Sequence, residues 1–148
     1  MLCNNWLKIA LLDELEHISW GVFVNLPLII SNWKLLPIAI FFAYLIDIDH
    51  LIWVGSLSVK KMLDLGGRPA FHSIPAVVMF SFMVYIISKS TIITLVSVNS
   101  MASHLIWDLA TGGVKLLYPW DKNFTISKRV SIIMFLVLFI SALIITYS

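Results

Sequence analysis

Long apolar runs make up most of this chain, and short polar segments separate them. A helix needs about 20 mostly apolar residues to span the hydrocarbon core of a bilayer, and a locally thinned bilayer accepts shorter runs. Runs of this kind cover about residues 18–33, 35–57, 74–88, 91–110 and 130–147. The pattern therefore predicts an all-α integral membrane protein with about five transmembrane helices in one bundle.

Polarity changes along the chain. We expect segment 4–16 to lie along the membrane interface and a polar core to extend over residues 14–120. The last run has no charged side chain from Val130 onward, which predicts a lipid-facing C-terminal helix at about 130–147. Because no internal repeat or low-complexity linker divides the chain, we predict a single domain over 1–148.

Composition narrows the function classes. Apolar residues make up 60% of the chain and charged residues 12%, which excludes an ordinary soluble domain. The net charge of +2 is too small and too dispersed to indicate nucleic-acid binding, so we expect no nucleic acid partner. The single cysteine, Cys3, excludes an intramolecular disulfide and a thiolate zinc site. Any metal must therefore have nitrogen and oxygen ligands.

The basic residues predict the orientation, because lysine and arginine near helix ends are retained on the cytoplasmic side. Lys34 and Lys89 fall on one side of the predicted bundle. The other eight fall on the opposite side: Lys8, Lys60, Lys61, Arg68, Lys115, Lys122, Lys128 and Arg129. We therefore predict a multi-pass protein of the inner (cell) membrane with a cytoplasmic N-terminus.

All four histidines and the aspartates of two predicted helices fall at the cytoplasmic end of this topology. An aspartate near the bilayer centre costs roughly 2.5–3.5 kcal/mol on insertion scales, so such residues need partners or water. Neutral histidine and ionised aspartate bind zinc, manganese or iron, and we expect a divalent metal, with zinc first. The candidate ligands are His17, Asp47, Asp49, His72, His104 and Asp108.

Local spacing supports this hypothesis. His104 and Asp108 are four residues apart, so both project from one helix face. Asp47 and His50 are three apart and can do the same, whereas Asp49 points elsewhere and can act as an outer-shell partner of a histidine. Which aspartate binds directly stays open.

Three other positions contribute to the predicted site. Glu14 lies three residues before His17, and is either part of the site or simply solvated. Gly21, one turn beyond His17, allows a neighbouring helix to approach closely. Gly112 and Gly113 should end the fourth helix.

The segment GGRPAFHSIP suits an anion. Ser73 can cap a helix whose first turn contains Pro75, and the free amides of that turn, with Arg68 nearby, would attract a phosphate. The alternatives are a plain positive-inside role for Arg68 and a plain capping role for Ser73. The segment therefore favours phosphoesters as substrates.

The segment SHLIWDLATGGVKLLYPW resembles the YdjM-like family of membrane-bound, metal-dependent hydrolases, in which a Ser-His-x-x-x-Asp helix runs into a Gly-Val and Tyr-Pro-aromatic loop. HISWG, LIDIDH and RPAFHS fit the same family in the same order, so the resemblance covers residues 17–120. It implies as metal ligands His17, the aspartates of DIDH, His72, His104 and Asp108.

The third block departs from the family pattern. The family usually reads His-Arg-x-x-Thr-His-Ser there, whereas this chain has Gly67 in place of the first histidine and Phe71 in place of the threonine. Whether these changes abolish activity stays open. The ligand order is also loosely similar to that of helical zinc-dependent phospholipases C, which implies phosphoester chemistry by analogy.

These observations lead to one main hypothesis. A metal-activated water, oriented by Asp47, Asp49 or His50 as catalytic residues, hydrolyses a phosphoester. Arg68 and Ser73 would bind the anionic head of a membrane lipid or lipid-linked substrate that enters from the cytoplasmic leaflet. The alternative is a non-enzymatic membrane assembly or ion-pathway protein whose His/Asp cluster is structural. Homo-oligomerisation stays open.

Overall fold

The computed structural model describes residues 3–54, 68, 70–120 and 122–148. The helices are α1 (Cys3–Val24), α2 (Leu26–Ser31), the 3-10 helix η1 (Trp33–Leu35), α3 (Leu36–Leu45), α4 (Ile48–Val54), α6 (Ile74–Ser88), α7 (Thr91–Thr111) and α8 (Lys128–Tyr147). Over these residues the regular elements are all helical, and one isolated β-bridge joins Val114 to Phe124. The predicted all-α class is confirmed.

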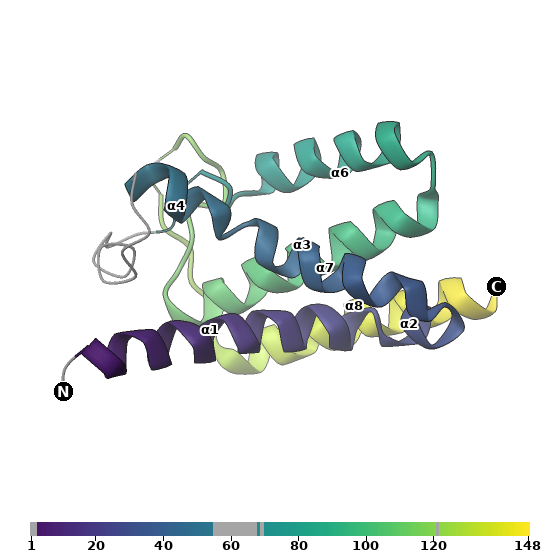
Figure 1. Cartoon of the computed structure of the whole chain (residues 1–148), viewed down its shortest axis with the longest axis horizontal. Helices are drawn as coiled ribbons and strands as arrows, with labels where there is room; N and C mark the ends of the chain where they lie inside the picture. The colour runs from purple at the N-terminus through teal and green to yellow at the C-terminus, as the bar shows by residue number, and fades with distance from the viewer. Residues whose placement is uncertain (1–2, 55–67, 69, 121) are drawn as a thin grey trace.

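Successive long segments run in opposite directions (Figure 1). Helix α1 is followed by α3 and α4, which lead back toward the N-terminal end, and α6, α7 and α8 continue the alternation. The two chain termini lie at opposite ends of the bundle. Helix α7 packs against α1, α3, α6 and α8, so it forms the centre of the fold.

The first two predicted segments differ from the observed helices. Helix α1 is continuous from Cys3 to Val24, because this stretch has no proline to break it, and α2 begins at Leu26 with Pro27 in its first turn. The second run divides into α3 and α4, and Asp47 precedes α4, where a carboxylate is favourable beside the free amides of a helix N-terminus. Residues 55–57, the predicted end of that run, lie outside the described residues.

The remaining helices begin and end where their sequences predict. Ser73, Ser90 and Ser127 cap α6, α7 and α8, each by accepting a hydrogen bond from a backbone amide of the first turn. Helix α7 ends at Thr111, followed by Gly112 and by Gly113 with a φ of +82°. A Cβ atom at Gly113 would lie 2.8 Å from side-chain atoms of neighbouring residues, so glycine is required there.

Helices α7 and α8 are long and apolar enough to cross a membrane. They differ in burial, since 61% of the α7 window is buried and only 17% of the α8 window. Helix α8 therefore presents apolar side chains outward, as the sequence predicts for a lipid-facing helix. The shorter α6 also exposes large apolar side chains, including Val78, Phe82 and Ile87.

Small and amide side chains hold three helices close together. A Cβ atom at Gly21 would lie 2.8 Å from the Cβ of Ala43, which confirms the predicted close approach, here between α1 and α3. The buried Asn25 amide donates to the Gly21 carbonyl (2.9 Å) and to the Ser100 hydroxyl (3.0 Å), and its oxygen accepts a hydrogen bond from Asn99 (3.3 Å). These contacts fix α1 against α7 one to two turns beyond His17.

Candidate metal centre

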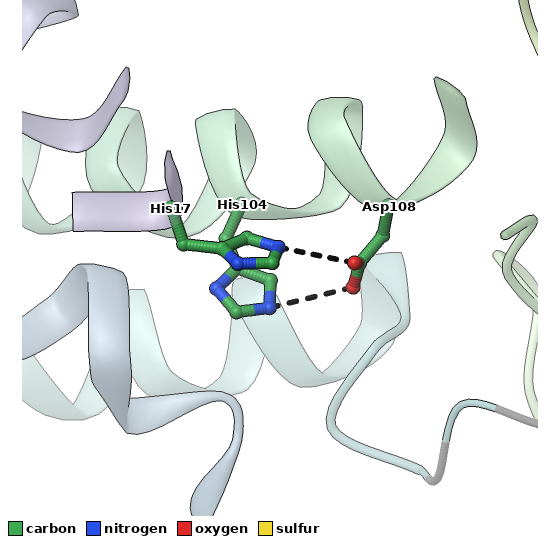
Figure 2. Close-up of side chains that lie close together, drawn as sticks. All are labelled: His17, His104 and Asp108. Carbon is green, nitrogen blue, oxygen red and sulfur yellow. Dashed lines mark hydrogen bonds and ion pairs between the residues drawn. The ribbon is translucent and has the colours of Figure 1, made fainter. Parts of the chain in front are cut away.

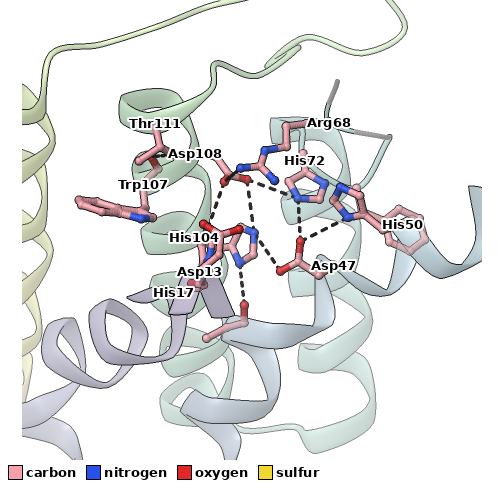
Figure 3. Close-up of polar contacts among 12 residues, drawn as sticks. Asp13, His17, Asp47, His50, Arg68, His72, His104, Trp107, Asp108 and Thr111 are labelled. Atoms are coloured by element: carbon pink, nitrogen blue, oxygen red, sulfur yellow. Dashed lines mark hydrogen bonds and ion pairs between the residues drawn. The ribbon is translucent and has the colours of Figure 1, made fainter. Parts of the chain in front are cut away.

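The candidate ligands lie close together, as Figure 3 shows for those that it labels. They come from α1, from the break before α4, from α4 itself, from the turn before α6 and from α7: His17, Asp47, Asp49, His50, His72, His104 and Asp108. Their sequence separation is large, so tertiary packing creates the cluster. His50, to which the sequence assigned a catalytic role and a place beside Asp47 on one helix face, lies among the candidate ligands.

The first group of candidate ligands consists of His17, His104 and Asp108, each with a side chain no more than 1% exposed. Nε2 of His17 lies 3.1 Å from Oδ1 of Asp108, and Nε2 of His104 lies 3.3 Å from Oδ2 (Figure 2). The two imidazole rings stack with their centroids 3.8 Å apart. One ligand atom from each residue lies within 4.8 Å of the others, close enough to hold one cation.

The second group consists of Asp47, His50 and His72, whose ligand atoms also lie within 4.8 Å of one another. Oδ1 of Asp47 lies 3.3 Å from Nδ1 of His50 and 3.2 Å from Nε2 of His72 (Figure 3). His72 is buried, and Asp47 and His50 have side chains only 12% exposed. This group lies beside the first and is slightly more accessible.

Backbone carbonyls orient the first two histidines. Nδ1 of His17 donates to the carbonyl of Asp13 (2.8 Å), and Nδ1 of His104 donates to the carbonyl of Ala43 (2.7 Å). A carbonyl oxygen only accepts, so each Nδ1 carries the proton and a neutral ring directs the lone pair of Nε2 at the carboxylates. Metal-bound histidines are oriented by outer-shell contacts of this kind.

The donor atoms at the middle of the cluster fit a cation. Nε2 of His104 lies 3.4 Å from Oδ2 of Asp47 and 3.3 Å from Oδ2 of Asp108, and all three atoms are buried without a hydrogen bond. Buried polar atoms nearly always have a partner, and a nitrogen lone pair facing two anionic oxygens is repulsive. A divalent cation bound by nitrogen and oxygen would satisfy all three atoms, so the residues present fit such an ion.

The sequence model of the YdjM inner membrane protein family matches residues 12–147. This chain belongs to that family. The match covers nearly the whole chain, so the resemblance that the four sequence blocks indicate is confirmed. Membership of an inner membrane protein family identifies a membrane protein.

Vertebrate relatives of the YdjM-family protein carry the name Transmembrane protein 267. The Xenopus laevis protein is 35% identical over 47% of this chain, the Bos taurus protein 37% over 51%, and the Danio rerio protein 35% over 45%. The chain spans about a third of the length of these relatives, namely 34%, 38% and 32%. No solved structure matches this chain.

Asp49 of the YdjM-family protein has the geometry of an outer-shell partner, one of the roles that the sequence left open. Its Oδ1 lies 3.4 Å from Nδ1 of His72, and its Oδ2 accepts a hydrogen bond from the amide of Phe71 (2.7 Å). Burial lowers the pKa of His72, but its hydrogen bonds with Asp47 and Asp49 outweigh burial and raise that pKa to about 9. The carboxylates therefore favour positive charge at this position.

Arg68 lies at the edge of the cluster. Its Nη2 is 2.7 Å from Oδ1 of Asp108, the same oxygen that faces His17, and its side chain is 21% exposed (Figure 3). The guanidinium thus contacts one buried candidate ligand and stays partly exposed. Gly67, where the family has a histidine, lies outside the described residues.

The first turn of α6 is less available to an anion than the sequence predicts. The amide of Ile74 donates to the carbonyl of Leu116 (2.9 Å), and the amides of Ala76 and Val77 donate to Ser73 (3.4 and 3.1 Å). Ser73 is 1% exposed and acts as the helix cap. Of the donors predicted for this anion site, the amides are engaged within the protein, and the guanidinium of Arg68 is the donor that remains.

Glu14 is the side chain whose role the sequence left most open. Its Oε2 is buried and has no hydrogen-bond partner, so it is not solvated. Glu16, in contrast, is exposed and accepts a hydrogen bond from the indole of Trp107 (3.0 Å). The spacing of three residues between Glu14 and His17 is the signal that distinguishes the two glutamates.

Proposed function

We propose that this YdjM-family protein is a membrane-embedded, metal-dependent hydrolase that cleaves a phosphoester of a lipid or lipid-linked substrate at the cytoplasmic leaflet. The observation that carries the proposal is the buried set of His17, His104 and Asp108, with His104 Nε2 facing two carboxylate oxygens. Burying these polar side chains in a membrane protein costs free energy, and a bound cation would offset that cost.

Five membrane-crossing segments and a cytoplasmic N-terminus belong to this proposal. The turns that carry Lys34 and Lys89 lie at the end of the bundle opposite the N-terminus (Figure 1). The break before α4 and the turn before α6, which carry Asp47 and His72 of the candidate metal centre, lie toward the N-terminal side, as does the loop between α7 and α8. The charge distribution thus supports a centre at the cytoplasmic face of a multi-pass inner membrane protein.

Different residues of the chain would bind the cation and transfer the proton. A bound divalent cation, with zinc first and manganese or iron as alternatives, would supply Lewis acidity and a water of lowered pKa. His17, His104 and Asp108 would hold it in the buried part of the centre. Asp47, Asp49 and His50 lie on the opposite side, and the one of them that binds no cation would accept a proton there.

Arg68 is the residue best placed to bind the anionic group. Its guanidinium reaches Asp108 and is also partly exposed, so it can contact a phosphate next to the buried ligands. Arginine binds planar anionic groups with two parallel hydrogen bonds, which orients a substrate as well as attracting it. This arrangement supports a phosphoester over a neutral substrate.

The surroundings of the centre support a lipid substrate. The loop after α7 exposes Tyr118 and Trp120, at 38% and 67%, and α6 exposes apolar side chains along its length. Aromatic side chains of this kind favour the headgroup region of a bilayer. A substrate held in the membrane would therefore meet the centre at the depth of its headgroup.

The test is metal analysis together with hydrolysis of a panel of lipid phosphoesters, including phosphatidate and a polyprenyl diphosphate. Protein purified without chelator or histidine tag should contain stoichiometric zinc or manganese, and His104→Ala and Asp108→Ala should lose both metal and hydrolysis. Glu16→Gln is the matched control, since this exposed carboxylate lies outside the centre. Metal and hydrolysis unchanged in both alanine variants would refute the proposal, and folded protein without stoichiometric metal would favour the structural or ion-pathway role.

A further inference from the structure

We infer that the centre holds two divalent cations bridged by the carboxylates of Asp47 and Asp108. The inference rests on the proposed metal-dependent function and adds the number of ions and the residues that join them. Each of the two ligand groups already supplies three side chains whose donor atoms lie within 4.8 Å of one another. The groups also come from different elements: α1 and α7 carry one, and α4, the residue before it and the turn before α6 carry the other.

Asp47 faces both groups. Its Oδ1 lies 3.3 Å from His50 and 3.2 Å from His72, the histidines of its own group. Its Oδ2 lies 3.4 Å from Nε2 of His104, a histidine of the other group. Each oxygen of this one carboxylate therefore points at the ligands of a different cation, as in a bridging carboxylate.

Asp108 also faces both groups. Its Oδ1 lies 3.1 Å from Nε2 of His17, within its own group. Its Oδ2 lies 3.3 Å from Nε2 of His104 and 3.4 Å from Nε2 of His72, which belongs to the second group. The two carboxylates thus connect the groups twice.

The distance between the groups suits a pair of ions. The rings of His72 and His104, one from each group, have centroids 5.3 Å apart, similar to the 4.9 Å between His50 and His72 within one group. Two-metal hydrolytic sites place their ions about 3.5–4 Å apart, with shared carboxylates. Ligand sets in direct contact are compatible with that spacing.

The charges indicate which substrate class a centre with two ions would attract. Asp47, Asp49 and Asp108 with Arg68 leave the centre with two net negative charges when the histidines are neutral. One divalent cation would neutralise this charge, whereas two leave a positive centre next to the guanidinium. A positive, partly exposed centre attracts an anionic phosphate group and provides contacts for two of its oxygens.

The experiment is a titration of metal-free, detergent-solubilised protein with Mn²⁺, followed by calorimetry and electron paramagnetic resonance. We expect two Mn²⁺ per chain and the spectrum of a magnetically coupled pair instead of the hyperfine pattern of isolated Mn²⁺. His50→Ala, which removes a ligand specific to the second group, should bind one Mn²⁺ with an isolated spectrum. Glu16→Gln should keep two coupled ions.

The outcomes separate this inference from the proposed function. One Mn²⁺ per chain in the unmodified protein overturns the pair but leaves a metal-dependent hydrolase. Two uncoupled ions overturn the bridging carboxylates, and no bound Mn²⁺, together with no stoichiometric metal as purified, overturns the proposed function as well. Circular dichroism and gel filtration report whether His50→Ala is folded, and the unmodified protein decides the question if that variant is not.

Discussion

His17 and Asp108 are separated by 91 positions in the sequence, yet Nε2 of His17 lies 3.1 Å from Oδ1 of Asp108. Both side chains are buried, and the contact joins α1 to the central helix α7. The carbonyl of Asp13 fixes the orientation of the His17 ring from behind. The centre therefore depends on how closely α1 and α7 pack.

Removing the outer-shell carboxylate should weaken metal binding without unfolding the protein. Asp49→Asn removes the negative charge beside Nδ1 of His72 and should lower metal affinity by about 10- to 100-fold, the usual effect of losing an outer-shell partner. Isothermal titration with Zn²⁺ measures the change. Asp13→Asn is the control, because His17 uses the backbone carbonyl at that position, and its affinity should match that of the unmodified protein.

Adding a methyl group at the α1–α3 contact should disturb the centre from a distance. Gly21→Ala places a Cβ atom 2.8 Å from that of Ala43, and overpacking of this kind costs about 1–3 kcal/mol. We expect a lower Tm in detergent and weaker metal binding, since α1 carries His17 and α3 leads to Asp47. The double variant with Ala43→Gly should recover both; a double variant as unstable as Gly21→Ala would contradict this explanation.

Arg68 should affect metal and substrate in opposite directions. Arg68→Gln removes a positive charge 2.7 Å from a ligand oxygen, so metal affinity should rise. The KM for a phosphoester should also rise, by about tenfold, which corresponds to about 1.4 kcal/mol of lost binding. Titration and steady-state kinetics measure the two effects. If neither the metal affinity nor the KM changes, Arg68 serves only to orient the chain in the membrane.

The asparagine contacts beyond the centre should matter for stability and not for metal stoichiometry. Asn25→Leu leaves the amide of Asn99 without its acceptor and removes the hydrogen bond with Ser100, at a cost of about 1–2 kcal/mol. We expect a lower Tm with the metal content retained. Asn32→Ala is the control, since that side chain is exposed and accepts a hydrogen bond only from the nearby amide of Lys34.

The proposed topology can be tested by labelling. In a Cys3→Ser background, Lys34→Cys or Lys89→Cys should react with a membrane-impermeant maleimide added outside the cell, because the turns before α3 and before α7 lie at the end of the bundle opposite the N-terminus. Cysteine at Lys122 should react only after the membrane is opened. Labelling of Lys122→Cys from outside the cell would show that the orientation is the reverse of the proposed one. Labelling of Lys34→Cys and Lys122→Cys from the same side would show that the number of membrane-crossing segments differs from five.

Local features of this protein were predictable from the sequence. Apolar run length predicted the positions of α6, α7 and α8, and the serine caps and Gly113 mark helix ends through interactions within a few residues. The pairing of His104 with Asp108 on one face also follows from helical periodicity alone. These features depend only on neighbouring positions.

The arrangement of side chains in the metal centre could be known only from the tertiary structure. The break after Leu45 turns Asp49 toward His72, and only the approach of α3 gives His104 a carbonyl partner at Ala43. The pairing of the Ile74 amide at the start of α6 depends on the carbonyl of Leu116, far along the chain. The sequence by itself determined which residues can bind a cation, because side-chain chemistry and local spacing are written in it. Packing between distant helices decided which atoms face one another, because those distances depend on many weak contacts acting together.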